Sequence, residues 1–353
     1  MLAHLRLVLG TKRGLVSMIA LVAGCGNTPV SLSTSDALPA DASPSEEAPP
    51  PPPELVRWLT GDPADRVTTA TSGILLMGGG TDVDAAFAWQ RDRIGGGDVV
   101  VLRASGSDGY NDYLFDEIAG VDSVETLRVD TRALALDPYI KWTIDHAEAV
   151  FLAGGDQAVY MAAWEGTPVS DALAAAWSRG AVIGGTSAGC AFLAGYVYTA
   201  SAGSVTSAEA LANPYDPYVT LARDVVSLPP LAAVITDTHF RARDRMGRML
   251  VFAARAIADG WATRPLALGI DEGTALVVDE TGLGTVVGSG AVYALAPDHA
   301  PSRCTSGDSL AWNDVPLFEL RAGATLALPG GTTSVAPVTL SAVDGALAPA
   351  NPY

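Results

Sequence analysis

A serine in the middle of the chain stands in a five-residue pattern that is typical of nucleophiles. The residues Gly185-Thr186-Ser187-Ala188-Gly189 have the form G-x-S-x-G. A serine on such a turn is held above a sheet edge in a strained backbone conformation. The apolar run 181–183 before it predicts a buried strand, and the alanine-rich run after it predicts a helix. The N–H of Ala188 at the helix start would face an oxyanion. The pattern therefore predicts nucleophilic catalysis by Ser187.

A nucleophilic serine needs a base, and histidine is the side chain that most often serves. His239 lies four residues after an apolar run at 232–235 that predicts a strand leading toward it. It therefore lies at the carboxyl end of the sheet, where Ser187 is also expected. His146 precedes a predicted strand and His299 lies in a proline-flanked loop. We therefore predict that His239 is the base.

The base needs a carboxylate that holds its tautomer. Asp237 and Glu272 both lie at predicted strand ends, so the residue types alone leave the choice open. Asp271, the neighbour of Glu272, points to the opposite face of its strand, so at most one of that pair serves. Asp237 is closer in sequence to His239, but neighbours on one strand point alongside each other. An acceptor behind the imidazole comes more readily from a separate strand end, which favours Glu272.

The segments that must position these residues alternate between short apolar runs and helix-like stretches. Runs at 74–77, 99–102, 124–129 and 149–153 precede the nucleophile strand. Continuous apolar strands alternating with helices indicate a parallel sheet covered on both faces. The chemistry of such a sheet lies beyond the carboxyl ends of its strands. We therefore predict an α/β fold with a doubly wound, mostly parallel sheet.

The second half of the chain is less regular. We predict a long irregular loop at 200–230, either a lid or a surface insertion, and a helix over 241–259. A strand is predicted over 266–278, and a hairpin turn at 281–284 leads into a further strand over 285–295. The predicted domains are a catalytic α/β peptidase domain at 70–295 and a small antiparallel C-terminal β-rich extension of unknown role at 296–353.

The charge balance restricts the partners. The 353 residues include 21 Lys and Arg against 39 Asp and Glu, a formal net charge of −18. This argues against nucleic acid or an anionic membrane surface as a partner and fits a solvated surface or cationic ligands. No Cys or His stands at metal-ligand spacing, and no nucleotide loop is present, so we expect neither a metal nor a cofactor. Cys190 is expected to be a small buried thiol.

The N-terminus predicts an export signal. Residues 1–24 hold a basic region and an apolar run too short to span a membrane. The run ends in Val22-Ala23-Gly24-Cys25, which resembles the bacterial lipobox, in which the cysteine is lipidated. A plain secretory signal is the alternative. Residues 25–55, rich in Pro and Ser, predict an extended tether. We therefore expect an exported protein, lipid-anchored through Cys25 to the bacterial cell envelope, or extracellular, with no other membrane contact.

Four blocks of the sequence resemble a known family. They are Gly154-Gly155-Asp156-Gln157, GGTSAG around Ser187, DTHFRARDRMGRML from Asp237 and GIDEGTALVV from Gly269. Together they resemble the cyanophycinases, in the serine peptidase family that includes dipeptidase E, over roughly residues 74–287. The resemblance implies a class I glutamine amidotransferase-like fold and a Ser187–His239–Glu272 triad. It also implies an oxyanion hole formed by the N–H groups of Gly155 and Ala188.

The same resemblance implies a substrate. Cyanophycin is a poly-aspartate with arginine on each β-carboxyl, and such exopeptidases release β-Asp-Arg dipeptides, here through an acyl-enzyme on Ser187. Acidic groups would receive the guanidinium, and arginines would bind free carboxylates. The expected partner is an Arg/Asp-containing peptide or polymer, and a homodimer is left open. Arg241 and Arg255 are expected on a solvated helix face. The implied groove residues are Gln157, Asp237, Arg243, Arg245 and Arg248.

Two departures leave the polymer specificity open. Thr238 stands where many relatives carry Gln, and Cys190 replaces the small residue usual after GTSAG.

A dipeptidase E-like aspartyl dipeptidase and a non-catalytic lipid-anchored binding protein are the alternatives. An α/β-hydrolase esterase is disfavoured because its acid precedes its histidine, whereas Glu272 follows His239. A β-lactamase-type enzyme would need Lys at 190, and a glutaminase of related fold would need Cys at 187.

Overall fold

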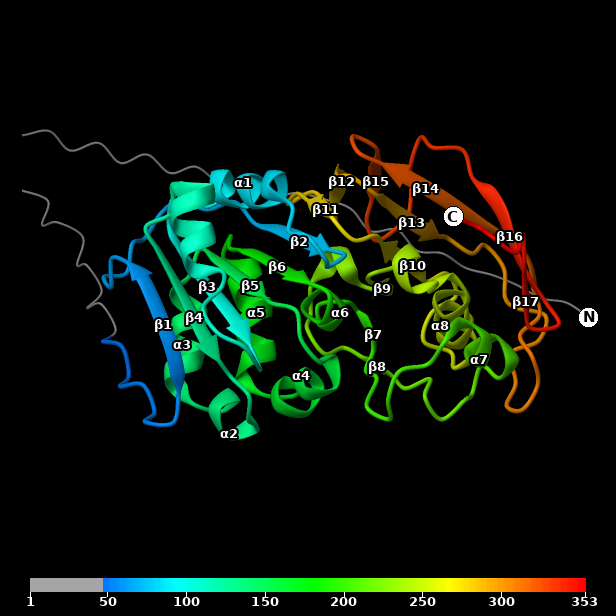
Figure 1. Cartoon of the computed structure of the whole chain (residues 1–353), viewed down its shortest axis with the longest axis horizontal. Helices are drawn as coiled ribbons and strands as arrows, with labels where there is room; N and C mark the ends of the chain where they lie inside the picture. The colour runs from blue at the N-terminus through cyan, green and yellow to red at the C-terminus, as the bar shows by residue number, and fades with distance from the viewer. Residues whose placement is uncertain (1–46) are drawn as a thin grey trace, which may run out of the picture. The chain divides into compact units, whose positions relative to one another are not determined.

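Two mixed sheets organise residues 47–353, the part of the chain that the computed structural model describes (Figure 1). The predicted signal, Cys25 and most of the predicted tether lie outside the described residues. Within residues 47–353, no helix combines the length and the apolar character needed to cross a bilayer.

The first sheet has nine strands in the order β1-β4-β3-β5-β6-β2-β11-β12-β15. Its five neighbours β4, β3, β5, β6 and β2 pair in parallel, and the strands outside them pair antiparallel. The apolar runs predicted this parallel part. The bounds are β1 Val56–Gly61, β2 Gly73–Met77, β3 Asp98–Arg103, β4 Ser123–Arg128, β5 Ala149–Leu152, β6 Val182–Thr186, β11 Thr274–Val278, β12 Leu283–Gly288 and β15 Thr325–Ala327.

Helices cover both faces of this parallel part, which explains why β2, β3 and β5 consist mainly of apolar residues. Leu75 and Phe151 pack on one face with Phe87 of α1, whereas Leu76 and Ile183 pack on the other face with Leu173 of α5. The helical segments of this half are α1 Asp84–Arg93, the π-helical η1 Tyr113–Ala119, α2 Arg132–Ala135, α3 Pro138–His146, α4 Gln157–Trp164, α5 Pro168–Ser178 and α6 Ala188–Phe192.

The second sheet has eight strands in the order β17-β16-β14-β13-β10-β9-β7-β8. Only β7, β9 and β10 pair in parallel, and the other pairs are antiparallel. The helix α8 packs against β9 and β10, with α7 beside it. The bounds are β7 Tyr196–Tyr198, β8 Leu221–Arg223, β9 Val234–Asp237, β10 Leu266–Ile270, β13 Ala291–Leu295, β14 Trp312–Arg321, β16 Val338–Val343, β17 Ala346–Ala348, α7 Ser207–Ala212, η2 Pro229–Leu231, η3 Arg241–Arg243 and α8 Met246–Ala258.

The prediction of one mostly parallel sheet is therefore corrected to two mixed sheets. The predicted strand over 266–278 is wrong as a single element, because β10 belongs to the second sheet and β11 to the first. The chain turns between them where the Asp271 carboxylate accepts the N–H groups of Arg241 and Ala291. The predicted strand over 285–295 divides in the same way, into β12 and β13, next to Gly288 at φ +104°.

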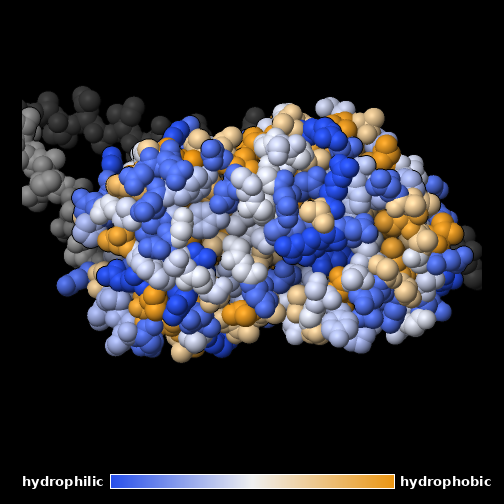
Figure 2. Space-filling view, in the orientation of Figure 1, coloured by the Kyte–Doolittle hydropathy of each residue, from blue (hydrophilic) through white to orange (hydrophobic). Residues whose placement is uncertain are grey.

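Residues predicted as an irregular loop and as an extension are both integrated into this architecture. The segment 200–230 contains α7, which begins with a capping box between Thr206 and Glu209 and packs against α8. The segment 296–353 adds three strands to the second sheet and β15 to the first. On the face drawn in Figure 2, apolar surface gathers over β16 and β17, where Val338 and Val343 are exposed.

Candidate active site

The turn that carries Ser187 has the strained geometry that the G-x-S-x-G pattern predicts. Ser187 lies between β6 and α6 with φ 52° and ψ −117°. A Cβ built on Gly185 would lie 2.6 Å from the carbonyl carbon of Gly189, and one on Gly189 would lie 2.1 Å from the carbonyl oxygen of Leu152. Any side chain at these two positions would therefore push α6 away from the sheet and move the serine.

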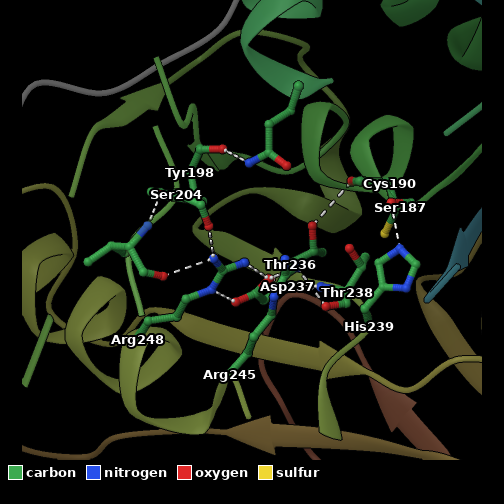
Figure 3. A network of polar contacts seen from close by, with 12 residues as sticks. Ser187, Cys190, Tyr198, Ser204, Thr236, Asp237, Thr238, His239, Arg245 and Arg248 are labelled. Atoms are coloured by element: carbon green, nitrogen blue, oxygen red, sulfur yellow. Dashed lines mark hydrogen bonds and ion pairs between the residues drawn. The ribbon is translucent and has the colours of Figure 1, made fainter. Parts of the chain in front are cut away.

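A hydrogen-bonded chain runs from Ser187 through His239 to Glu272. The Ser187 Oγ lies 2.9 Å from Nε2 of His239, and Nδ1 of His239 lies 2.6 Å from Oε1 of Glu272 (Figure 3 shows the serine and the histidine). A carboxylate can only accept, so Nδ1 carries the proton and Nε2 is left to accept the serine hydroxyl. The three residues come from three places in the fold: the end of β6, the loop after β9 and the connection from β10 to β11.

The surroundings of His239 keep its imidazole neutral near neutral pH. Burial lowers the pKa of His239, the hydrogen bond to Glu272 opposes this, and the nearby cations Arg243 and Arg245 lower the pKa further. The His239 side chain is 11% exposed and that of Glu272 is 45% exposed. A neutral imidazole with a free Nε2 lone pair can take the serine proton. This arrangement can therefore perform nucleophilic catalysis.

Asp237 is buried at the end of β9 and pairs with two arginines. Its carboxylate accepts Nε and Nη2 of Arg248 at 2.7 and 2.6 Å and Nη1 of Arg245 at 3.1 Å (Figure 3). The Asp237 side chain is 5% exposed and that of Arg248 is 3% exposed. This differs from the expectation that both line the substrate groove, because each already has its charge partner inside the protein. Arg248 also donates to Ser204 and to the carbonyl of Val205.

The other groove residues implied by the resemblance are more accessible. Arg243 is exposed, and Arg245 is partly exposed beyond its bonds to Asp237 and the Thr238 carbonyl. Gln157 begins α4 and donates from Nε2 to the carbonyl of Tyr198 at 2.5 Å. These three side chains therefore remain candidates for substrate contact.

The two arginines expected on a solvated helix face differ from each other. Arg241 is exposed, as predicted. Arg255 is only partly exposed, because its guanidinium lies 3.7 Å from the ring centre of Tyr215 and pairs with Asp259. The prediction of a solvated Arg255 is therefore wrong.

The predicted oxyanion donors lie beside the nucleophile. A Cβ on Gly154 would lie 3.5 Å from Cβ of Ser187, so the loop after β5 runs next to the serine. The N–H of Ala188 starts α6 and that of Gly155 precedes α4. Within residues 47–353 neither N–H has a backbone hydrogen-bond partner. Their role as an oxyanion hole stays a prediction that this placement allows.

The remaining titratable candidates lie elsewhere or are inert. Cys190 is fully buried, and burial raises the pKa of its thiol to about 12. His146 bonds to the Trp142 carbonyl at the end of α3, and His299 pairs with the exposed Asp298. No three His, Cys, Asp or Glu side chains converge as metal ligands would within residues 47–353.

Two features had long-range contacts that the sequence did not reveal. The glycines 78–80 were recognisable only as a run at a strand end, yet Gly78 accepts the His239 N–H through its carbonyl at 2.7 Å. Tyr353 accepts the Met246 N–H through its hydroxyl at 2.9 Å, and the hydroxyl donates to Asp244. Their roles depend on segments that lie more than 100 residues away, so local patterns could not reveal them.

An acidic cavity of about 570 Å³ opens next to Glu272. Asp82 and Asp84 also line it, and each accepts a tyrosine hydroxyl, from Tyr110 and Tyr113 respectively. Burial raises the pKa of Asp82. The cavity is lined by Thr81, Asp82, Val83, Asp84, Glu272, Gly273, Gly288 and Ser289.

Comparison with known proteins identifies the family of this chain. A cyanophycinase from Nostoc sp. is 32% identical over 185 residues, and one from Synechococcus elongatus is 34% identical over 189 residues. The matched regions cover 52% and 53% of this chain but only 56% and 53% of those relatives. A solved peptidase from an acI-B1 actinobacterium superposes with a TM-score of 0.50 at 17% identity, covering 74% of this chain and 98% of that one, and supports the fold alone.

Residues 110–286, more than half of the chain, match the profile of Peptidase family S51. The chain therefore belongs to peptidase family S51, and these relatives support a serine-type peptidase hydrolase.

Proposed function

We propose that this protein is a serine exopeptidase that cleaves aspartyl peptide bonds next to arginine-bearing residues, as in cyanophycin. The observation that carries the proposal is the hydrogen-bonded chain Ser187–His239–Glu272 in a member of family S51. The relatives named above are cyanophycinases, and their activity comes to this chain only as part of the proposal. A class I glutamine amidotransferase-like arrangement of the first sheet belongs to the same proposal.

In the proposed reaction the serine oxygen attacks the peptide carbonyl carbon while Nε2 of His239 takes the hydroxyl proton. The N–H groups of Gly155 and Ala188 would stabilise the negative oxygen of the tetrahedral intermediate. The imidazolium then gives its proton to the leaving nitrogen, the C–N bond breaks, and an ester remains on Ser187. Water attacks this ester with His239 again as the base, which releases the acid and restores the serine. Glu272 holds the imidazole in the required tautomer throughout.

The charges around the triad support a substrate of mixed charge. Arg243 and Arg245 lie close enough to His239 to lower the pKa of its imidazole, so they can also bind a substrate carboxylate near the reacting atoms. The acidic cavity beside Glu272 suits a guanidinium. Figure 2 shows a broad hydrophilic area in the region where Figure 1 places β9, β10 and the start of α8. A purely apolar peptide would fit this face poorly.

The test is a panel of substrates digested by the full chain, with Ser187→Ala as the blank. Cyanophycin, α-aspartyl dipeptides and a p-nitrophenyl ester separate the candidates, with products identified by mass spectrometry. The proposal expects β-Asp-Arg dipeptides from cyanophycin. Cleavage of α-aspartyl dipeptides alone would instead indicate a dipeptidase E-like enzyme. No turnover of any substrate would leave a binding protein on a peptidase fold.

We also propose that the protein is exported and anchored through a lipid on Cys25. The lipobox-like run before Cys25 and the Pro-rich segment after it support this. Cys25→Ser should release the protein from the membrane fraction. A wild-type chain that is soluble and carries no lipid would contradict the proposal.

A further inference from the structure

The turn after β2 connects the elements that hold all three triad residues. The carbonyl of Met77 accepts the N–H of Ser187 at 3.1 Å, and the carbonyl of Gly78 accepts the N–H of His239 at 2.7 Å. The carbonyl of Gly79 accepts the N–H of Gly273, the residue after Glu272, at 3.0 Å. Three successive carbonyls thus bond to the nucleophile, the base and the neighbour of the acid.

These bonds matter because the two reacting residues have strained backbones. Ser187 has φ 52° and His239 has φ 47°, both in the left-handed region that side chains disfavour. Such conformations persist only where surrounding contacts determine them. The bonds to Met77 and Gly78 are contacts of this kind, since they fix the peptide group in front of each strained residue.

The glycines also form the wall against which the base and the acid lie. A Cβ built on Gly79 would lie 2.5 Å from both Cε1 and Nε2 of His239, and one on Gly80 would lie 2.9 Å from Cβ of Glu272. The imidazole cannot swing aside freely, because it is bonded to Ser187 at one nitrogen and to Glu272 at the other. A methyl group on Gly79 therefore forces the imidazole or the turn itself to shift, and a shift of the imidazole distorts both hydrogen bonds.

We propose that Gly79 and Gly80 are positioning residues, which set the places of the base and the acid relative to Ser187. The inference rests on the proposed function for its catalytic consequence, but the contact itself is a property of the fold. Both glycines have positive φ, +90° and +73°. Alanine at a positive φ destabilises the backbone at any position in a protein. The test must therefore separate this backbone penalty from displacement of the imidazole.

The chain offers matched controls for this separation. Gly323 has φ +86° and Gly260 has φ +72°, and a Cβ on either meets nothing within 4 Å. Gly323→Ala therefore reproduces the backbone penalty of Gly79→Ala without the clash, and Gly260→Ala does the same for Gly80→Ala. Any loss of activity or stability beyond that of the control variants is then due to the contacts of Gly79 with His239 and of Gly80 with Glu272.

The experiment measures hydrolysis and the rate at which a fluorophosphonate labels Ser187 in the full chain. Displacing a catalytic group by about 1 Å costs roughly 100-fold. We expect Gly79→Ala to lower kcat and the labelling rate by about this factor with KM nearly unchanged. Gly323→Ala should leave both rates near wild type. Equal rates for Gly79→Ala and Gly323→Ala would overturn the proposal.

A stability cycle tests the contact without any activity. In wild type, Gly79→Ala should lower the Tm more than Gly323→Ala does. In a His239→Ala background the clash is gone, so the two alanine variants should lower the Tm equally. If Gly79→Ala still lowers the Tm more than Gly323→Ala in the His239→Ala background, the proposal is overturned. If the wild type cleaves no substrate the proposed function fails, while this cycle still decides whether Gly79 positions His239.

Discussion

The two sheets contribute differently to the active site. The first sheet supplies Ser187 at the end of a parallel strand, whereas His239 and Glu272 come from the strand ends of the mixed second sheet. Neither sheet holds a complete triad. The reacting atoms meet only because the chain crosses from β10 to β11 at Glu272 and because the turn 77–79 bonds to both halves. Catalysis in this protein therefore depends on how two sheets are held together.

Removing the serine that the first sheet contributes should have the largest effect on turnover. Ser187→Ala leaves the base and acid in place but removes the attacking oxygen, so we expect kcat to fall by about 10⁶-fold. Stability should change little, because losing one hydroxyl costs little free energy of unfolding. Steady-state hydrolysis and fluorophosphonate labelling measure this, with the exposed Ser178→Ala as the control. Labelling of another serine in the Ser187→Ala variant would show that the nucleophile lies elsewhere.

Removing the acid of the second sheet should have the next largest effect. Glu272→Gln keeps the shape of the side chain but presents an amide to Nδ1, so the imidazole loses its required tautomer. We expect kcat to fall by about 10⁴-fold with KM nearly unchanged. Glu280→Gln, an exposed acid paired with Arg93 on the β11–β12 turn, is the matched control. Near wild-type kcat in Glu272→Gln would contradict the triad assignment.

The Asp237→Asn variant tests whether this acid of the second sheet stabilises the fold or binds the substrate. Asp237→Asn leaves the buried Arg248 without its partner, and breaking a buried pair costs about 3–5 kcal/mol of unfolding free energy. Urea denaturation measures this, with Asp259→Asn, in the less buried pair with Arg255, as a control of smaller effect. Unchanged stability with a raised KM for arginine-bearing substrates would instead place Asp237 on the substrate.

The smallest expected effect concerns the pH profile. Because the Arg243 cation lowers the pKa of His239, Arg243→Gln should raise that pKa. At low pH the base is protonated and kcat/KM falls. The pH at which this fall occurs should therefore be higher in the variant. High salt should reduce the shift, since Arg243 is exposed and screened. Arg241→Gln, a neighbouring exposed arginine, is the control, and an equal shift there would show a general charge effect.

Much of the first sheet was predictable because its signals are local. Strands β2, β3 and β5 consist mainly of apolar residues, and Ser187 stands in a turn whose glycines are needed because the backbones approach closely. The second sheet was harder to predict. The residues 266–278 and 285–295 have the composition of single strands, yet each divides between two sheets. Turns held by distant groups, such as the Asp271 carboxylate, leave no local pattern.

The sequence by itself predicted Ser187 as the nucleophile, the strand–turn–helix that presents it and the histidine that follows a strand end. It left two carboxylates as partners for His239, and both the expected strand geometry and the resemblance to a family favoured Glu272. The tertiary structure shows Asp237 occupied by Arg248 and Arg245, which leaves Glu272 at 2.6 Å from Nδ1. The physical reason is that a carboxylate bonds to the donors nearest in space. Those donors come from segments whose distances are set by the packing of two sheets and not by their order along the chain.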